Sequence, residues 1–370
     1  RQPLHSGTMS TSPRFNVLPL NAPGAEAPRP GPVDRLARPL RDLRLSVLDR
    51  CNLRCSYCMP EESLQGQGVF LPREALLTDD ELVRLVRVFT RLGVHKIRLT
   101  GGEPLLRPGL ASLVERIAAV PGIEDLALTT NGTLLPRLAG DLRAAGLSRV
   151  TVSLDSLDEA AFQRLSGSRG SVTDVLDGIA AAEAAGFRSL KINTVIQRGI
   201  NDDGAEALVN HFRGTGHTVR FIEYMDVGNM NDWRREQVVP SAELLERIHA
   251  RWPLRPLASE VRGETARRYA FEDGQGEIGF ISSITQPFCG DCSRARVTAE
   301  GNFYTCLFAN SGVALRPLLR QESSDDRLGD YLTERWAARQ DRYSEVRGRE
   351  VVESPVPAND SRVEMFRMGG

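Results

Sequence analysis

The chain has few lysines, few cysteines, no large excess of charge of either sign and no long apolar run. Only Lys96 and Lys191 among its 47 basic residues are lysines, and 48 acidic residues bring the net charge to −1. This balance argues against a surface-wide nucleic-acid or membrane footprint and leaves any bound anion to a local site. No apolar run of about 18 residues and no secretory signal pattern occur. We therefore expect a cytoplasmic protein with reduced thiols, and neither nucleic acid nor membrane as a partner.

Three parts are expected along the 370 residues. Residues 1–40 hold eight prolines and no sustained apolar period, so we expect a disordered N-terminal arm. Residues 41–260 alternate strand-like and helical stretches and form the predicted core domain. From residue 261 the alternation stops, and we expect a second module that runs to residue 370.

The alternation in the core domain predicts six strand–helix units. Strands are expected near residues 43–48, 95–100, 125–130, 149–154, 189–195 and 218–224. Helical stretches lie at residues 78–93, 172–186 and 241–251, and Thr78 and Glu81 have the spacing of a capping box at the first of them. Such units form a parallel sheet with right-handed crossovers, either doubly wound or curled as a barrel.

Charged residues recur on one face of the predicted strands. Lys96, Arg98 and Thr100 share a face of one strand, and Lys191 and Asn193 share a face of another. Because both faces of a parallel sheet are normally covered, cations there are costly unless they surround a wet, anionic ligand. We therefore predict an α/β fold with an incomplete (β/α)6 TIM-type barrel around a polyanion. Strand-edge cations that reach solvent are the alternative.

The second module has its own signals. Residues 299–302 predict the turn of a β-hairpin, with cysteines on either side of it. Residues 320–330 are expected to form a loop, residues 330–343 a helix, and the chain ends on a Gly-Gly tail.

Cys51, Cys55 and Cys58 lie within eight positions, although the whole chain has only six cysteines. This spacing suits a [4Fe-4S] cluster, for which cysteine is the usual ligand, and a set of three would leave one iron open for chemistry. A structural zinc site would be closed by a fourth ligand, and the nearest later histidine is His95. Zinc with a distant fourth ligand, or a disulfide plus a spare thiol, is the alternative.

The C-x3-C-x2-C arrangement, with Tyr57 before its last cysteine and Gly-Gly-Glu-Pro at residues 101–104, resembles the radical S-adenosylmethionine (SAM) superfamily. The resemblance implies that Cys51, Cys55 and Cys58 bind a [4Fe-4S] cluster whose open iron chelates SAM. It also implies a set of SAM contacts, namely Tyr57, Gly102, Glu103, Ser153 and Met225.

A second trio, Cys289, Cys292 and Cys306, narrows the family. Together with the "CSRAR" segment and the terminal Gly-Gly, it makes residues 40–370 resemble the GTP 3′,8-cyclases, the MoaA-type enzymes of molybdenum cofactor biosynthesis. The resemblance implies a second [4Fe-4S] cluster that binds the guanine of GTP and faces the first cluster across the barrel mouth. It implies GTP contacts at Arg44, Lys96, Arg98, Thr129, Lys191, Arg220, Arg294 and Arg296. It also implies catalytic roles for Arg294, Arg296 and the tail residues Gly369 and Gly370.

The reaction implied by the resemblance is a radical cyclisation. A 5′-deoxyadenosyl radical removes hydrogen from C3′ of GTP, and bonding of C3′ to C8 gives 3′,8-cyclo-7,8-dihydro-GTP. The implied partners are a flavodoxin- or ferredoxin-like electron donor and a downstream cyclic pyranopterin monophosphate synthase, and a homodimer is compatible with the sequence.

Two other functions compete with this interpretation. A radical SAM peptide-modifying enzyme with an auxiliary-cluster domain is the nearest, although such domains usually carry more cysteines. An iron–sulfur or zinc protein without catalysis would explain both trios, but neither the Gly-Gly-Glu-Pro segment nor the charged strand faces.

Overall fold

The protein is described from a computed structural model, which covers residues 31–64, 70–321, 324–350 and 362–369. Its centre is a set of six parallel strands, each paired with the next. Their bounds are β1 Asp42–Ser46, β2 Lys96–Thr100, β3 Asp125–Thr130, β4 Arg149–Ser153, β5 Lys191–Ile196 and β6 Thr218–Glu223. All six lie within two residues of the predicted strands at either end, so this part of the prediction is confirmed.

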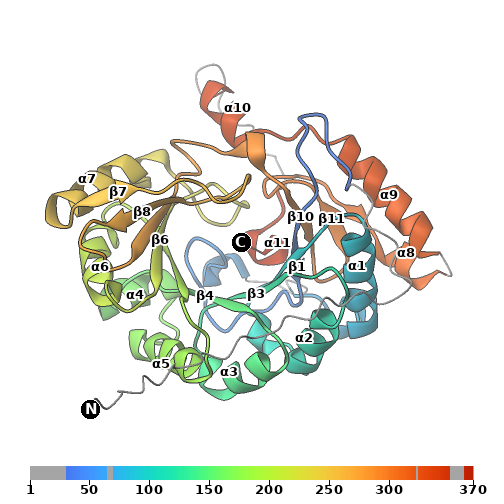
Figure 1. The fold of residues 1–370 in the computed structure, drawn as a ribbon, viewed down its shortest axis with the longest axis horizontal. Coiled ribbons are helices and arrows are strands. Elements are labelled where there is room, and N and C mark those ends of the chain that lie inside the picture. Colours follow the sequence, from blue (N-terminus) through green and yellow to red (C-terminus); the bar gives the residue numbers. More distant parts are fainter. Residues whose placement is uncertain (1–30, 65–69, 322–323, 351–361, 370) are drawn as a thin grey trace, which may run out of the picture.

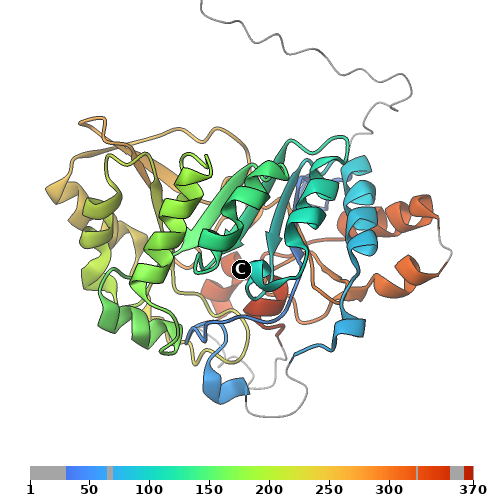
Figure 2. The same cartoon turned by 90° about the horizontal axis from the view of Figure 1, so that it is seen from below.

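Seven helices cover the outside of these strands. They are α1 Asp79–Arg91, α2 Leu110–Ala118, α3 Leu135–Ala144, α4 Glu159–Ser166, α5 Val172–Ala184, α6 Ala205–Phe212 and α7 Ser241–Arg251. The predicted capping box is present at α1, where Thr78 accepts from the Glu81 amide and the Glu81 carboxylate accepts from the Thr78 amide. Figures 1 and 2 show the helices on the outside of the curved sheet and the C-terminus inside it.

The sheet continues at both ends into strands of the C-terminal part. Next to β6 come β9 Glu277–Ile281, β8 Arg267–Phe271 and β7 Leu254–Pro256, and next to β1 come β10 Arg294–Val297, β11 Asn302–Tyr304 and β12 Val313–Ala314. No pairing among the described residues joins β12 to β7, so the barrel stays open, as predicted. The predicted hairpin is formed by β10 and β11. The predicted domain division at residue 260 falls between β7 and β8, which pair with each other.

Part of the predicted N-terminal arm is folded. Residues 31–40 are packed: Val33 pairs with Pro39, and Leu40 is 1% exposed, so this part of the predicted arm is wrong. Between Pro32 and Pro39 the chain makes a compact turn around Asp34, which accepts from the Leu36, Ala37 and Arg38 amides. Residues 1–30 lie outside the described residues.

The helices of the C-terminal part also depart from the prediction. They are α8 Arg316–Arg320, α9 Asp325–Ala337, α10 Tyr343–Glu350 and α11 Met365–Met368. Helix α9 begins inside the expected loop because Ser324 caps it by accepting from the Arg327 amide. The expected helix at 330–343 is broken at 338–342, where Arg339 and Asp341 make contacts with the loops of the second cysteine trio.

The apolar core lies between the sheet and its outer helices. Leu43, Leu45, Leu99 and Val152 point outward from their strands and are fully buried against helices α1 to α5. The residues between them in sequence therefore point to the inside of the barrel, where the charged side chains are. No helix in the described part of the chain is long and apolar enough to cross a membrane.

Candidate active site

The first trio lies on the loop that follows β1. The Cys58 amide donates to the Cys55 carbonyl over 2.9 Å, and the Asn131 side chain donates to Cys51 Sγ over 3.8 Å. Burial raises the pKa of all three thiols, to about 11 for Cys51, and the neighbouring thiols add to this for Cys55 and Cys58. The three sulfurs therefore share one buried environment at the carboxyl end of β1.

The Gly-Gly-Glu-Pro segment after β2 packs on the same loop. Gly102 and Glu103 donate their amides to the carbonyls of Leu48 and Arg50, over 2.8 Å each. A Cβ on Gly102 would lie 2.2 Å from the Arg50 carbonyl oxygen, which explains why glycine is needed there. Glu103 is buried and accepts from Thr130 Oγ1 and from the Leu105 and Asn131 amides, and burial raises its pKa to about 7.

The other predicted SAM contacts lie close to the first trio, with one exception. Tyr57 and Ser153 line a small cavity of about 30 Å³ together with Cys55 and Asp155. Tyr57 donates to Asp155 Oδ2 over 2.7 Å, which fixes its ring beside the trio. Met225 lines the larger central cavity instead.

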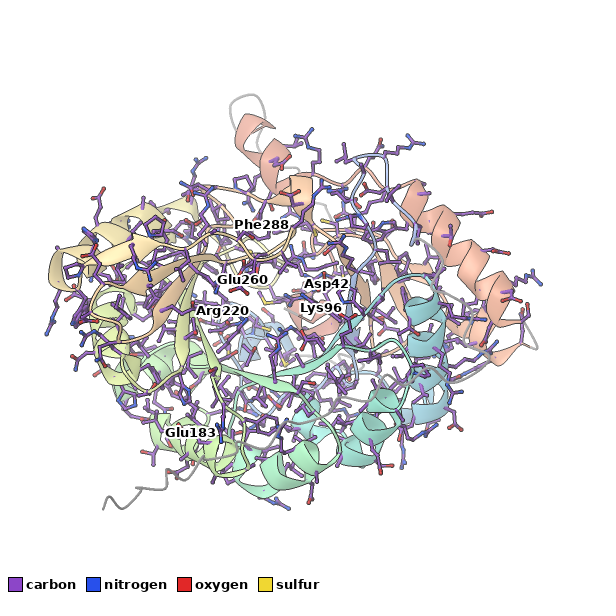
Figure 3. All side chains as sticks on the ribbon, in the orientation of Figure 1. Asp42, Lys96, Glu183, Arg220, Glu260 and Phe288 are labelled. Atoms are coloured by element: carbon purple, nitrogen blue, oxygen red, sulfur yellow. The ribbon has the colours of Figure 1, made fainter. Side chains whose placement is uncertain are left out.

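That central cavity has a volume of about 450 Å³ and lies inside the barrel. Twelve Arg and Lys residues line it against six Asp and Glu. All eight predicted GTP contacts are among its lining residues: Arg44, Lys96, Arg98, Thr129, Lys191, Arg220, Arg294 and Arg296. Figure 3 shows Lys96, Arg220, Asp42, Glu260 and Phe288 gathered around this centre, whereas Glu183 lies on the outer helical layer. We call the eight predicted contacts the cation cage.

Strand register explains how the cage is built. Arg44 on β1 is aligned with Arg98 on β2 and with Arg296 on β10. Arg98 donates to Thr129 Oγ1 and Thr151 Oγ1 over 3.0 Å each. Cations at aligned positions on neighbouring parallel strands thus face the same space.

The positively charged residues of the cage repel one another. Burial, followed by the charge of Arg220, lowers the pKa of Lys191 to about 8. Burial and neighbouring arginines likewise lower the pKa of Arg220 and Arg296 to about 9 each. A bound polyanion would relieve this repulsion, so the cavity is suited to a ligand with several negative charges.

The second trio borders the same cavity from its other end. Cys289 and Cys292 lie on the loop before β10, Cys306 follows β11, and all three line the cavity. Burial alone would raise the pKa of Cys292, but the charges of Arg294 and Arg339 lower it to about 6. Arg294 also lies over the Phe288 ring at 5.3 Å.

The two trios lie at opposite ends of the barrel strands. Cys51 follows the carboxyl end of β1, whereas the Ser293 carbonyl accepts from the Arg41 and Asp42 amides at its amino end. The expectation that the two trios face each other across the barrel mouth is therefore wrong in its geometry: the interior of the barrel lies between them.

The C-terminal tail enters the barrel from the side of the first trio. Met365 packs against the cluster of Tyr57, Leu165 and Tyr224, as Cys55 and Cys58 do, and Arg296 donates to the carbonyls of Met368 and Gly369 over 3.2 and 2.5 Å. A Cβ on Gly369 would lie 1.9 Å from Thr100 Oγ1, and its φ is +68°. Gly370 lies outside the described residues.

Comparisons with known proteins agree with this site. Residues 45–212 match the family model of the radical SAM superfamily, and residues 217–345 match that of Molybdenum Cofactor Synthesis C. A relative from Xanthomonas axonopodis pv. citri, named GTP 3′,8-cyclase, is 57% identical over 91% of this chain and 98% of its own. One from Acidothermus cellulolyticus, with the same name, is 52% identical over 89% of this chain and 92% of its own.

The chain belongs to the GTP 3′,8-cyclase family. The crystal structure of Streptococcus suis SuiB bound to S-adenosylmethionine matches it with a TM-score of 0.57 at 14% identity, over 84% of this chain and 68% of that one. This likeness shows the fold alone, a radical SAM partial barrel. The predicted fold, family and enzyme class are thereby confirmed.

The radical SAM family implies a [4Fe-4S] cluster and SAM, and the first trio fits the cluster. The trio consists of three thiols that form no disulfide, and thiols are the groups that bind iron–sulfur clusters. The second trio offers the same donor set, with one thiol already favoured as thiolate. Among the described residues, no three His, Cys, Asp or Glu side chains form a group that could hold a single metal ion.

Sequence reasoning missed several residues of this family member's site. Arg149 lines the cavity, and its even spacing from Thr151 on β4 could have revealed it. Asp155 holds Tyr57, and nothing in the sequence alone pairs them. Arg38 and Arg339 also line the cavity, although one belongs to the predicted arm.

Proposed function

We propose that this protein converts GTP to 3′,8-cyclo-7,8-dihydro-GTP by radical SAM chemistry, in the first step of molybdenum cofactor biosynthesis. The observation that carries the proposal is a cavity lined by mutually repelling cations, with the second cysteine trio at its border and the first trio at the carboxyl ends of the same barrel strands. The names of the relatives and both family matches support the same activity.

The cation cage would hold the triphosphate. Lys191, Arg220 and Arg98 come from three different strands, so their charges converge from different sides on one ligand. Charge-assisted hydrogen bonds from such groups to phosphate oxygens are short and strong, and they fix the position of the ribose as well. Arg44, Lys96, Thr129, Arg294 and Arg296 complete the proposed contacts.

The second trio would hold a second [4Fe-4S] cluster, whose open iron binds the guanine base. The low pKa of Cys292 and the nearby Arg294 and Arg339 support a thiolate site there. A guanine bound at that end would leave the ribose to point into the cavity, toward the first trio.

The first trio would hold the catalytic cluster. With SAM bound, that cluster supplies a 5′-deoxyadenosyl radical able to remove the C3′ hydrogen of GTP. Around it, Tyr57 and Ser153 would contact the nucleoside part of SAM, and Gly102 and Glu103 its methionine end. Met225, which lines the central cavity, would contact SAM from the substrate side.

The tail would close the reaction space. Arg296 bonds to the Gly369 carbonyl, so the same guanidinium that belongs to the cation cage also holds the tail inside the barrel. A glycine backbone fits against Thr100, where any side chain would collide. Filling the barrel in this way excludes water from a reactive radical.

We also propose a flavodoxin- or ferredoxin-like electron donor, a downstream cyclic pyranopterin monophosphate synthase and a cytoplasmic location. A homodimer is compatible with the chain.

The decisive experiment is anaerobic incubation of the reconstituted protein with SAM, reductant and GTP labelled with deuterium at C3′. Mass spectrometry should find the cyclised nucleotide and 5′-deoxyadenosine that carries deuterium. Formation of 5′-deoxyadenosine without label transfer, or zinc in place of iron in the purified protein, would contradict the proposal. Modification of a peptide but not of GTP would favour the peptide-modifying alternative.

A further inference from the structure

A network of two arginines and two aspartates, all buried except the half-buried Asp341, lies behind the second trio. Asp34 and Arg38 come from the turn at residues 33–39, and Arg339 and Asp341 from the break between α9 and α10. Arg38 Nε donates to Asp34 Oδ2 over 2.6 Å, and Arg339 Nη1 donates to the same oxygen over 3.2 Å. The side chains of Asp34, Arg38 and Arg339 are at most 2% exposed. Figure 1 shows the N-terminal turn, in blue, beside β10 and α9.

The network binds the backbone of two of the cysteines and the side chain beside the third. Arg38 Nη1 donates to the Cys289 carbonyl over 2.7 Å, and Arg339 Nη1 donates to the Cys292 carbonyl over 2.6 Å. Next to Cys306, Thr305 Oγ1 donates to Asp341 Oδ2 over 2.6 Å.

The network also closes on itself. Arg38 Nη1 donates a second bond to the Asp341 carbonyl over 2.8 Å, and Arg339 Nε lies 3.5 Å from Asp341 Oδ2. Trp336 Nε1 donates to the Arg38 carbonyl over 3.0 Å, and the Arg339 guanidinium lies over the Trp336 ring at 4.5 Å. The network has two positive and two negative charges and is neutral overall, which lowers the free-energy cost of burying it. Planar guanidinium forks with several donors suit this geometry better than a lysine ammonium.

The other functions of the site do not account for these residues. Arg38 and Arg339 line the cavity, but their hydrogen bonds go to backbone carbonyls and carboxylates behind the trio. Because each arginine is already paired with an aspartate, the network has no net positive charge with which to bind a triphosphate. What it does supply is a fixed spacing between the cysteine carbonyls, and cluster ligands depend on such surrounding contacts for their orientation.

We propose that Asp34, Arg38, Arg339 and Asp341 form a positioning network that sets the geometry of the auxiliary cluster on Cys289, Cys292 and Cys306. The inference rests on the proposed function, because it requires the second cluster. It makes residues 33–39, which precede the radical SAM match, part of the substrate-side metal centre.

The test separates the two trios in the full-length chain. In background A, Cys51, Cys55 and Cys58 are replaced by alanine, so that bound iron reports on the second trio alone. In background B, Cys289, Cys292 and Cys306 are replaced by alanine. The variants Arg38→Met and Arg339→Met are made in both. Arg84→Met serves as the matched control, because Arg84 also ties distant segments together through Asp325 and the Leu319 carbonyl.

Iron content, the electron paramagnetic resonance (EPR) spectrum of the reduced cluster and its change on GTP addition are measured after anaerobic reconstitution. In background A we expect Arg38→Met and Arg339→Met to lose at least half the iron, or to shift the spectrum and lose its response to GTP. Arg84→Met should match its parent. In background B all three variants should keep the iron content and SAM binding of their parent.

Each contrary result has a distinct meaning. An unchanged spectrum and GTP response in Arg38→Met and Arg339→Met would overturn the inference, and so would equal iron loss in both backgrounds, which marks general destabilisation. Arg38→Lys keeps the charge and loses the fork, so a fully restored spectrum in that variant would refute a geometric role. A parent in background A that holds no iron would sink the proposed second cluster itself, and the inference with it.

Discussion

Lys191 makes the affinity for GTP depend on pH in a way that can be worked out in advance. Burial and the charges of Arg220, Arg149 and Arg98 lower its pKa to about 8 in the free protein. A triphosphate adds several negative charges to the same cavity, so the pKa of Lys191 is higher in the complex. The complex therefore binds more protons than the free protein, and the affinity for GTP falls as the pH rises through 8.

The size of the effect follows from this pKa. At pH 8 Lys191 is about half protonated in the free protein, so binding should take up about half a proton per GTP. Between pH 7 and pH 9 the affinity should fall about tenfold, which is about 1.4 kcal/mol. Ionisation of GTP itself contributes as well, and a control variant has to remove that part.

Anaerobic titration calorimetry at pH 8, in two buffers that differ in ionisation enthalpy, measures the proton uptake directly. Lys191→Arg is the control, because a guanidinium in this cage has a pKa of about 9, as Arg220 and Arg296 show, and so stays largely protonated at pH 8 while GTP ionises as before. The uptake of the parent should exceed that of Lys191→Arg by about half a proton. Equal uptake in the two proteins would show that Lys191 is already charged in the free cage, and the argument from mutual repulsion would be refuted.

Three further outcomes check the rest of the site. Cys55→Ala should abolish SAM cleavage, whereas Cys292→Ala should retain some cleavage without cyclised product; equal loss of both activities in the two variants would contradict separate roles. Gly369→Ala should weaken tail docking by ~2–5 kcal/mol, from left-handed strain and the collision with Thr100, and protection from hydrogen exchange at residues 362–369 should fall accordingly. Arg296→Ala should weaken GTP binding by about 1.5–3 kcal/mol, roughly tenfold or more, and unchanged affinity by calorimetry would remove Arg296 from the cage.

The barrel and the cation cage could be predicted because both follow from short-range patterns in the sequence. Alternation by two placed Lys96 and Arg98 on the inner face, and the structure has both lining the cavity. The same counting would have included Arg149, which shares the parity of Thr151 on β4.

The network behind the second trio could not be predicted, because its partners are far apart in sequence. Asp34 and Arg339 are 305 residues apart, and Arg38 and Asp341 are 303 apart. Nothing local marks such a contact, and the prolines around Asp34 have the composition of a disordered segment. The pairing of β9 with β6 is also non-local, so the continuation of the sheet beyond residue 260 could not be predicted from the strand–helix alternation.

The direction of the strands explains why the two trios lie at opposite ends of the barrel. All six strands run parallel, so the first trio and the Gly-Gly-Glu-Pro segment meet at their carboxyl ends. Because β10 runs parallel to β1, the cysteines before β10 lie at the opposite end. Five strand residues, Asp42–Ser46, separate the two ends by roughly 17 Å at the usual rise. A ligand that reaches both trios must then lie lengthwise in the barrel, with the cation cage around its middle. Active sites of closed barrels collect at the carboxyl ends of the strands. An open barrel can instead use its whole interior, and here three cysteine thiols lie at either end of that interior.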